Sequence, residues 1–194
     1  MRAAGVQRLV HSSGIGADPD SRSSYIRSRG LGERAVRQAF PSAIVVRPAV
    51  MFGPDDAFLT SIEEIMRRSR FFPLFGNGET RLQPVHVGDV AEAIARVLSR
   101  SSVSTTYELG GPRVLSYRKV IGIVGERIGA RPVVVSVPFP AWRVAAFAAE
   151  FLPNPPLTRN QVELMEIDTV AASDVPGFAS LDVTPRDIEL RAEK

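Results

Sequence analysis

The sequence predicts an α/β fold, with a doubly wound parallel sheet and a small, mostly helical C-terminal appendage. Short apolar runs alternate along the chain with amphipathic stretches of helical length. The run at 43–48 is apolar almost throughout, which is typical of a parallel strand buried on both faces. From residue 138 onwards prolines become frequent and no further strand pattern follows. We therefore place the sheet domain at 1–137 and the appendage at 138–194.

The bounds of the individual elements follow from the prolines, glycines and polar turn residues between the apolar stretches. A strand around Leu9 and Val10 leads into a helix from Tyr25 to Phe40, and the strand at 43–48 completes a parallel strand-helix-strand unit. We expect Asp89 to cap a helix, with a role as a ligand as the alternative. The remaining elements are expected as helices at 58–70, from 89 onward, at 116–128 and at 142–151, and as strands at 82–87, 107–109 and 133–137.

The last of these helices carries a row of large apolar side chains. We expect the row to pack against the body of the protein, because apolar stripes at helical spacing usually face a core. A partner or a lipid surface is the alternative. The row consists of Trp142, Val144, Phe147 and Phe151.

Composition excludes several classes of function. The chain has 194 residues, of which 44% are hydrophobic, so it can bury a core. Its net charge is only +3 and the basic residues are scattered, which predicts no nucleic-acid surface. With no cysteine and two histidines, we expect no disulfide and no metal cluster. No apolar run approaches the roughly 20 residues of a membrane span, so we expect a cytoplasmic protein.

Chemistry is indicated by two serines and a tyrosine–arginine pair. Ser12 and Ser13 follow the first strand, and Tyr25 and Arg29 stand four residues apart on the predicted helix, hence on one face. A neighbouring positive charge favours a phenolate, which can act as a base. This arrangement predicts a site for hydride-transfer chemistry.

Three blocks in order resemble the short-chain dehydrogenase/reductase superfamily. They are the Tyr-x-x-x-Lys-like pair, Arg47–Pro54 and Pro84–Ala91. Within that superfamily the chain looks like the atypical, extended members of the NAD-dependent epimerase/dehydratase-like type, which are relatives of the dinucleotide-binding accessory subunit of respiratory complex I. The segments that carry this narrower resemblance are His11–Asp18, Gly53–Phe58, Thr80–Val85, Tyr107–Pro112 and Pro156–Val162.

The resemblance implies an NAD(P)-binding Rossmann-like domain, of which this chain would be the C-terminal part. It implies NAD or NADP as cofactor, and complex I subunits or a second copy of the chain as partners, with the inner membrane surface as an alternative location. Its catalytic residues would be Tyr25, Arg29 and Ser13. Its cofactor-binding residues would be Ser12, Ser13, Tyr25, Arg29, Arg47, Pro48, Ala49 and Val50, and its substrate-binding residues Phe52, Arg81 and His86.

Four of these residues have structural alternatives. Tyr25 could be an ordinary aromatic residue at the start of the helix that packs on the loop. Arg47 could pair with a carboxylate inside the body, as arginines at strand ends commonly do. His86 could be a structural histidine, and Arg81 a surface charge. Each alternative is decided by which partners the fold supplies.

The chain departs from the family pattern in three places. Arg29 stands where the superfamily has lysine, and Gly14 falls where active sugar epimerases place a serine or threonine. No Gly-x-x-Gly-x-x-Gly turn precedes the strand at Leu9, so we expect that the half of the fold with the cofactor loop is missing.

These departures favour a dinucleotide-binding or assembly-type protein that is non-catalytic or incomplete. The alternative is an oxidoreductase or epimerase that acts on a nucleotide-sugar-like or lipid-linked substrate, with Tyr25 as base and Ser13 as its hydrogen-bonding helper.

Overall fold

The chain forms two compact units, each assembled from separate stretches of sequence. The computed structural model describes residues 5–54, 56–100, 103–153, 155 and 157–189. Asp55 and Pro156, which belong to segments that carry the family resemblance, lie outside the described residues. The first unit comprises Met1–Gly53, Gln83–Arg113 and Thr169–Lys194, and the second Pro54–Leu82 and Val114–Asp168. The expected division at residue 137 runs along the sequence, whereas these units interleave.

A three-stranded parallel sheet is the centre of the first unit. Its order is β1-β2-β7, formed by β1 (Val10–Ser12), β2 (Ile44–Pro48) and β7 (Thr106–Leu109). Val10 pairs with Ile44, and Val45 with Thr106. The middle strand, β2, is fully buried at Val45 and Val46, as its apolar sequence predicted.

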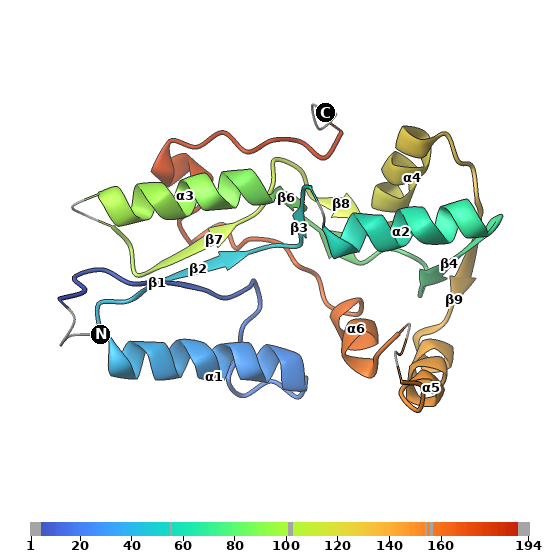
Figure 1. Ribbon diagram of the computed structural model, residues 1–194, viewed down its shortest axis with the longest axis horizontal. Coiled ribbons are helices and arrows are strands. Elements are labelled where there is room, and N and C mark those ends of the chain that lie inside the picture. Colours follow the sequence, from blue (N-terminus) through green and yellow to red (C-terminus); the bar gives the residue numbers. More distant parts are fainter. Residues whose placement is uncertain (1–4, 55, 101–102, 154, 156, 190–194) are drawn as a thin grey trace. The chain divides into compact units, whose positions relative to one another are not determined.

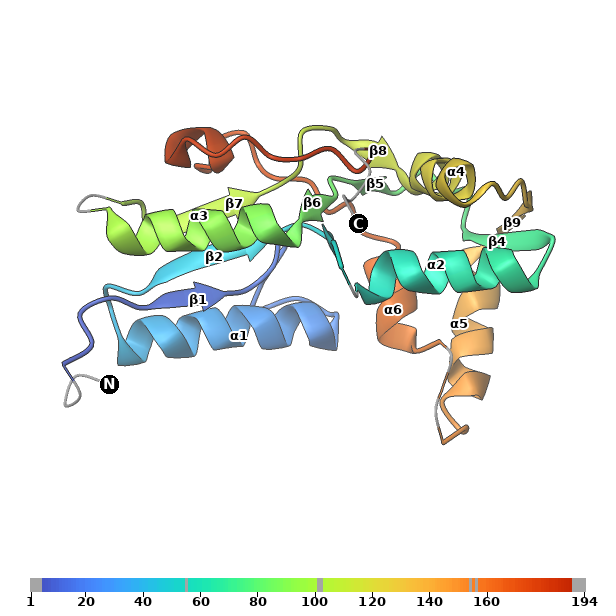
Figure 2. The same ribbon diagram turned by 45° about the horizontal axis from the view of Figure 1, so that its top comes forward.

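Helices cover both faces of this sheet, which confirms the expected α/β fold. Figure 1 shows α1 (Ser24–Ala39) on one side of the strands and α3 (Val87–Ser99) on the other, and Figure 2 shows the same layers after a rotation. The apolar core lies under α3, whose Val90, Ala93 and Val97 join Ile44 and Val46 of β2. The other face of β2 is turned toward α1.

The ends of α1 follow the residues expected to set them. The helix begins after Ser23 and ends at Phe40, whose N–H bonds the carbonyl of Val36, immediately before Pro41. Proline cannot continue a helix because it has no N–H. The expected helix at 25–40 is therefore confirmed to within one residue at either end.

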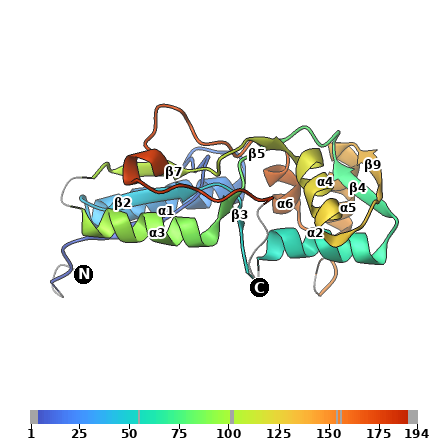
Figure 3. The ribbon, with the colours of Figure 1, turned by 90° about the horizontal axis from the view of Figure 1, so that it is seen from above.

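The second unit is built around a parallel strand pair. The strands β4 (Phe71–Phe75) and β9 (Val133–Val137) pair in register from Phe71 and Val133 onward. The helix α2 (Ala57–Arg68) packs against α4 (Tyr117–Ile128), and α5 (Phe139–Ala149) packs against α6 (Arg159–Leu164) (Figure 3). The helix α4 ends at Gly129, whose φ of 69° is left-handed and suits glycine.

The single strand expected at 82–87 is instead two. The structure has β5 (Arg81–Leu82), antiparallel to β8 (Leu115–Ser116), and β6 (Val85–His86), parallel to β3 (Met51–Phe52). Pro84 lies between β5 and β6. Because proline cannot donate to a strand ladder, it interrupts the pairing there.

Three of the four side chains in the apolar row on and just after α5 do not enter a core among the described residues. Val144, Phe147 and Phe151 are 70%, 52% and 78% exposed, so the expectation of core packing was wrong for these three. The helix turns the other stripe inward: Ala146 is fully buried, and the indole N–H of Trp142 donates to the Leu74 carbonyl at 2.9 Å. The inward positions are set by their spacing of four residues.

Among the described helices, none combines the length and apolarity needed to cross a membrane.

One glycine of α1 is required by the close approach of a loop. A Cβ at Gly30 would lie 2.2 Å from the backbone nitrogen of Pro19 and 2.3 Å from the carbonyl carbon of Asp18. We expect Gly30→Ala to lower the free energy of unfolding by about 1–3 kcal/mol, because backbone atoms must move to relieve the clash. Urea unfolding followed by circular dichroism measures this change.

Gly32→Ala on the same helix is the matched control. Its Cβ would meet only Nε2 of His11, at an ordinary 3.8 Å. Alanine is the better helix former by roughly 0.5–1 kcal/mol, so Gly32→Ala should be neutral or stabilising. Equal losses in the two variants would contradict the packing of α1 against the Asp18–Pro19 loop.

Candidate functional site

The expected site residues Ser12 and Ser13 lie at the carboxyl end of the central sheet. Ser12 ends β1, and the Ser13 N–H donates to the Val46 carbonyl at 2.8 Å. Ile15 donates in turn to the Pro48 carbonyl at 3.1 Å. These bonds fix the turn after β1 to the end of β2, which is where ligands bind in open parallel sheets.

Tyr25 and Arg29 meet at this turn, as their spacing predicted. The guanidinium of Arg29 donates through Nη2 to the Tyr25 hydroxyl and through Nη1 to the Ser13 carbonyl at 2.7 Å. Its central carbon lies 4.7 Å from the centroid of the Tyr25 ring. The structure therefore brings Ser13, Tyr25 and Arg29 together, with Arg29 between the other two.

Ser13 joins this group through its backbone and not through its side chain. The residue is 7% exposed, and its hydroxyl has no hydrogen-bond partner among the described residues. A helper of a catalytic tyrosine must reach the reacting group by a hydrogen bond. The geometry does not place the Ser13 hydroxyl in that position.

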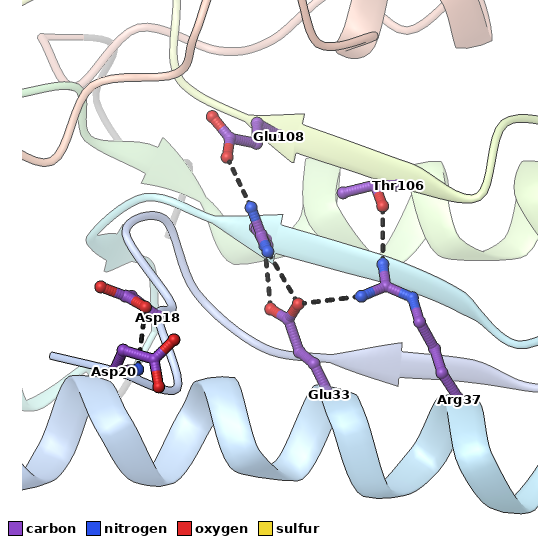
Figure 4. Close-up of polar contacts among 7 residues, drawn as sticks. Asp18, Asp20, Glu33, Arg37, Thr106 and Glu108 are labelled. Carbon is purple, nitrogen blue, oxygen red and sulfur yellow. Dashed lines mark hydrogen bonds and ion pairs between the residues drawn. The ribbon is translucent and has the colours of Figure 1, made fainter.

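The polar contacts continue along α1 beyond Arg29. Tyr25, Arg29, Glu33 and Arg37 recur every four residues, so they form one polar stripe on the helix. Figure 4 shows Glu33 and Arg37 at the sheet-facing side of α1, with Arg37 reaching Thr106. In the same view Asp18 and Asp20 form a separate turn, where the Asp20 N–H donates to the Asp18 carboxylate. The stripe lies beside the buried apolar residue Ile26, so α1 turns a partly polar face to the sheet.

Glu33 of the stripe forms a paired hydrogen bond with Arg47 of β2. Arg47 on β2 donates from Nε and Nη2 to the two carboxylate oxygens of Glu33, at 2.8 and 2.7 Å. Its Nη1 donates to Glu108 of β7 at 3.3 Å, and the other oxygen of Glu108 accepts from the Ala172 N–H. Every guanidinium nitrogen of Arg47 thus faces a carboxylate. In this fold Arg47 pairs with carboxylates inside the body, which was the structural alternative to cofactor binding.

Charge pairing outweighs burial at Glu33. Burial by itself would raise the pKa of Glu33, but the hydrogen bonds from Arg47, with the charges of Arg47 and Arg37, hold it below its ordinary value of 4.5. The neighbouring Ser13 side chain also contributes to lowering this pKa. The Glu33 hydrogen bond correspondingly raises the pKa of Arg47. Both groups are therefore charged at neutral pH.

The other expected cofactor residues contribute mainly backbone contacts. Pro48 and Ala49 are buried, and the Ala49 N–H donates to the Leu109 carbonyl at 2.9 Å. The carbonyl of Val50 accepts from Val85 at 3.0 Å. These groups lie at the carboxyl end of the sheet, next to the turn after β1 whose Ser13 carbonyl accepts from Arg29.

The three expected substrate residues divide between the two units. Phe52 and His86 belong to the first unit and stack edge to face, with their ring centroids 5.3 Å apart. Arg81 belongs to the second unit, where it is exposed and pairs with Asp168 at 2.8 Å. The structure thus brings two of the three together.

His86, rather than Asp89, caps α3. Its Nδ1 accepts the Gly88 N–H at 3.0 Å, so this nitrogen must be unprotonated. Asp89 is buried and instead accepts from the backbone and the side chain of Arg186, at 2.6 and 2.7 Å. The expected cap at Asp89 was wrong, because a partner 97 positions away in the sequence takes its carboxylate.

Two of the cavities lined by described residues lie beside the first unit, and neither lining includes Tyr25 or Arg29. One of about 410 Å³ lies beside α1 and is lined in part by Glu33, Arg37 and Arg47. The other, of about 580 Å³, lies beside β7 and is lined in part by Gln83 and Glu108. Sequence reasoning missed Glu33 and Glu108, although the continuation of the four-residue spacing from Arg29 was a signal for Glu33.

Comparison with known families and structures agrees with this architecture. Residues 1–110 match the model of the NAD dependent epimerase/dehydratase family. The chain belongs to this family. Its first 110 residues include the turn, α1, β2 and β7 described above.

The most similar relatives include mitochondrial subunits of complex I. The NADH dehydrogenase [ubiquinone] 1 alpha subcomplex subunit 9 of Arabidopsis thaliana is 34% identical over 95% of this chain and 49% of its own length. The rat subunit is 33% identical over 98% of this chain and 51% of its own. A ceramide reductase of Caulobacter vibrioides is 32% identical over 72% of this chain and 44% of its own length. The chain thus spans about half the length of these curated relatives.

Solved structures share the fold. The crystal structure of gox2253 superimposes with a TM-score of 0.66 at 23% identity, over 96% of this chain and 64% of that one. DesIV, a dTDP-glucose 4,6-dehydratase from Streptomyces venezuelae with NAD bound, gives a TM-score of 0.55 at 25% identity, over 70% and 49%.

The buried ion pair generates a stability prediction. Arg47→Met should lower the free energy of unfolding by about 3–5 kcal/mol, because it leaves the Glu33 and Glu108 carboxylates buried without their partner. Thermal unfolding at neutral pH measures the loss. Glu64→Gln, in an exposed pair with Arg68, is the control and should change little. A loss no larger than the control's would mean that the Arg47 contacts do not form.

The Glu33 carboxylate also predicts an acid dependence. Its folded-state pKa is lowered, so its contribution to stability is complete above pH 4.5 and is lost as the pH falls through the lower folded value. Unfolding free energies from about pH 5 down to about pH 3 should therefore fall less steeply in Glu33→Gln than in the wild type. Parallel curves would exclude a charged, paired Glu33.

His86 predicts a second pH dependence, nearer neutrality. Burial, together with the Arg186 charge, lowers the pKa of His86 from 6.5, and the nearby Asp89 only partly opposes this. The neutral cap therefore stabilises the fold above pH 6.5, and this contribution is lost as the pH falls through the lower folded value. His86→Asn keeps a capping acceptor but cannot titrate, so its Tm should fall less between about pH 7 and about pH 5. A steeper fall in the variant would contradict the cap.

Proposed function

We propose that this protein is a non-catalytic dinucleotide-binding protein of the complex I subunit 9 type. The observation that carries the proposal is the position of Arg29, which holds the Ser13 carbonyl and the Tyr25 hydroxyl at the carboxyl end of the sheet. This arrangement offers hydrogen-bond donors to a ligand and leaves the Ser13 hydroxyl out of the group.

The residues present fit one part of a dinucleotide. A guanidinium has five N–H groups, and only two bonds of Arg29 are accounted for among the described residues. The remaining donors and the half-exposed Tyr25 phenol suit the oxygen-rich sugars of NAD or NADP. A bound nicotinamide would supply hydride-transfer chemistry. We assign the nicotinamide-side contacts of the dinucleotide to these residues, because they lie at the carboxyl end of the parallel sheet.

The lack of turnover follows from the chemistry of arginine. Its guanidinium stays protonated and is broader than a lysine ammonium, so the two are not interchangeable beside a catalytic phenol. Here it also spans from Tyr25 to the backbone of Ser13. The proposal therefore gives Arg29 a binding role and gives Tyr25 no base function.

The relatives suggest the setting. The protein would associate with subunits of respiratory complex I as a peripheral protein at the inner membrane, with self-association as the alternative. Its similarity to mitochondrial complex I subunits over nearly the whole chain supports this setting.

Fluorescence titration with NADH and with NADPH tests the binding. We expect saturable binding of one or both without consumption of the reduced cofactor, and about 2–10-fold weaker binding in Tyr25→Phe, which loses one hydrogen-bonding group. Tyr117→Phe, which changes a buried tyrosine of the second unit, is the control. Absence of binding to either nucleotide would sink the proposal, and so would a turnover that Tyr25→Phe abolishes.

A second candidate is an NAD(P)-dependent reductase or epimerase with Tyr25 as base. It is favoured by the ceramide reductase relative and by the cation that contacts the Tyr25 hydroxyl. Incubation with NADPH and a long-chain ketone would separate the two candidates. Tyrosine-dependent oxidation of the cofactor supports the reductase, and an inert mixture supports the binding protein.

A further inference from the structure

Gly14 leaves a space that another side chain fills. The residue is buried in the turn after β1, and a Cβ built on it would lie 1.7 Å from Nη1 of Arg29 and 2.8 Å from its guanidinium carbon. The backbone of Gly14 is not in the left-handed region, since it is not among the glycines of positive φ. An alanine would therefore suit the backbone, and only the Arg29 side chain excludes it.

The guanidinium that fills the space is anchored at both ends. Nη1 donates to the Ser13 carbonyl at 2.7 Å, and Nη2 donates to the Tyr25 hydroxyl. Arg29 reaches the Ser13 carbonyl by crossing the position that the first side-chain atom of residue 14 would occupy. Any residue larger than glycine at position 14 therefore competes with the contact between Arg29 and Tyr25.

We propose that Gly14 is a positioning residue that admits Arg29 to the Tyr25 phenol, so that Gly14 and Arg29 act as one coupled unit. The glycine itself contacts no ligand. It determines whether the phenol lies beside a fixed guanidinium or stands alone. This inference concerns the same site as the proposed function. Only its nucleotide-binding test rests on that function, because the tyrosine ring signals are measured without a ligand.

Gly14 differs from Gly30 of α1 in which atoms an added side chain would meet. A Cβ at Gly30 would strike backbone atoms, which cannot move without the loop, whereas a Cβ at Gly14 would strike the far end of a flexible side chain. Gly14→Ala should therefore leave the fold intact and displace Arg29. Its effect at Tyr25 should match that of Arg29→Gln.

The test is an NMR spectrum of the aromatic ring signals of the purified protein. The chain has three tyrosines, and the Tyr25 signal is the one that Tyr25→Phe removes. We expect Gly14→Ala and Arg29→Gln to move this signal to the same position, because each removes the guanidinium that lies 4.7 Å from the ring centroid. The double variant should move it no further. Gly32→Ala, whose Cβ meets no atom closer than 3.8 Å, should leave it in place.

Two outcomes would overturn the proposal. The first is a Tyr25 signal in Gly14→Ala that keeps its wild-type position while Arg29→Gln moves it. The second is an additive shift in the double variant, which would show that the two residues act separately. A titration with NADH then extends the test: Gly14→Ala and Arg29→Gln should change the Kd by the same factor. If the wild type binds no nucleotide, the proposed function fails, whereas the ring signals still decide the coupling.

Discussion

The buried pair of Glu33 and Arg47 is the interaction on which the first unit depends. Glu33 is 2% exposed and would be strongly disfavoured as a lone charge, so α1 can lie on the sheet only where Arg47 meets it. Arg47 extends the link through Glu108 to β7 and, from there, to the Ala172 N–H. A single guanidinium thus joins the helix, the two strands β2 and β7, and a distant part of the chain.

The same pair positions the candidate site one turn away along α1. Arg47 of β2 holds Glu33 of α1 in place. Arg29, four positions earlier on the same helix face, then faces the turn after β1, where it bonds the Ser13 carbonyl. The next position of the stripe, Tyr25, reaches the guanidinium of Arg29. The geometry of the site is therefore set by helix periodicity together with one buried ion pair, and Gly14 supplies the space for it.

The parts that could be predicted from the sequence are those set by neighbouring residues. The bounds of α1, the buried strand β2 and the contact between Tyr25 and Arg29 follow from periodicity, proline and four-residue spacing. The partners of Asp89 and Arg47 lie 97 and 14 or more positions away, and no local pattern identifies them. The outward face of α5 was missed because the fully buried position of the helix is Ala146, although the larger Val144 and Phe147 are exposed. Volume alone does not decide which side of a helix is buried.

Hydrogen exchange at the backbone amides of α1 tests the central claim most directly. If the pair of Glu33 and Arg47 holds this helix on the sheet, Glu33→Gln should speed exchange across Ser24–Ala39 while α2 and α4 in the second unit keep their wild-type rates. Unchanged exchange in α1 would contradict the account. An equal rise in both units would do so as well, because it would show that Glu33 acts on global stability and does not specifically hold α1 in place.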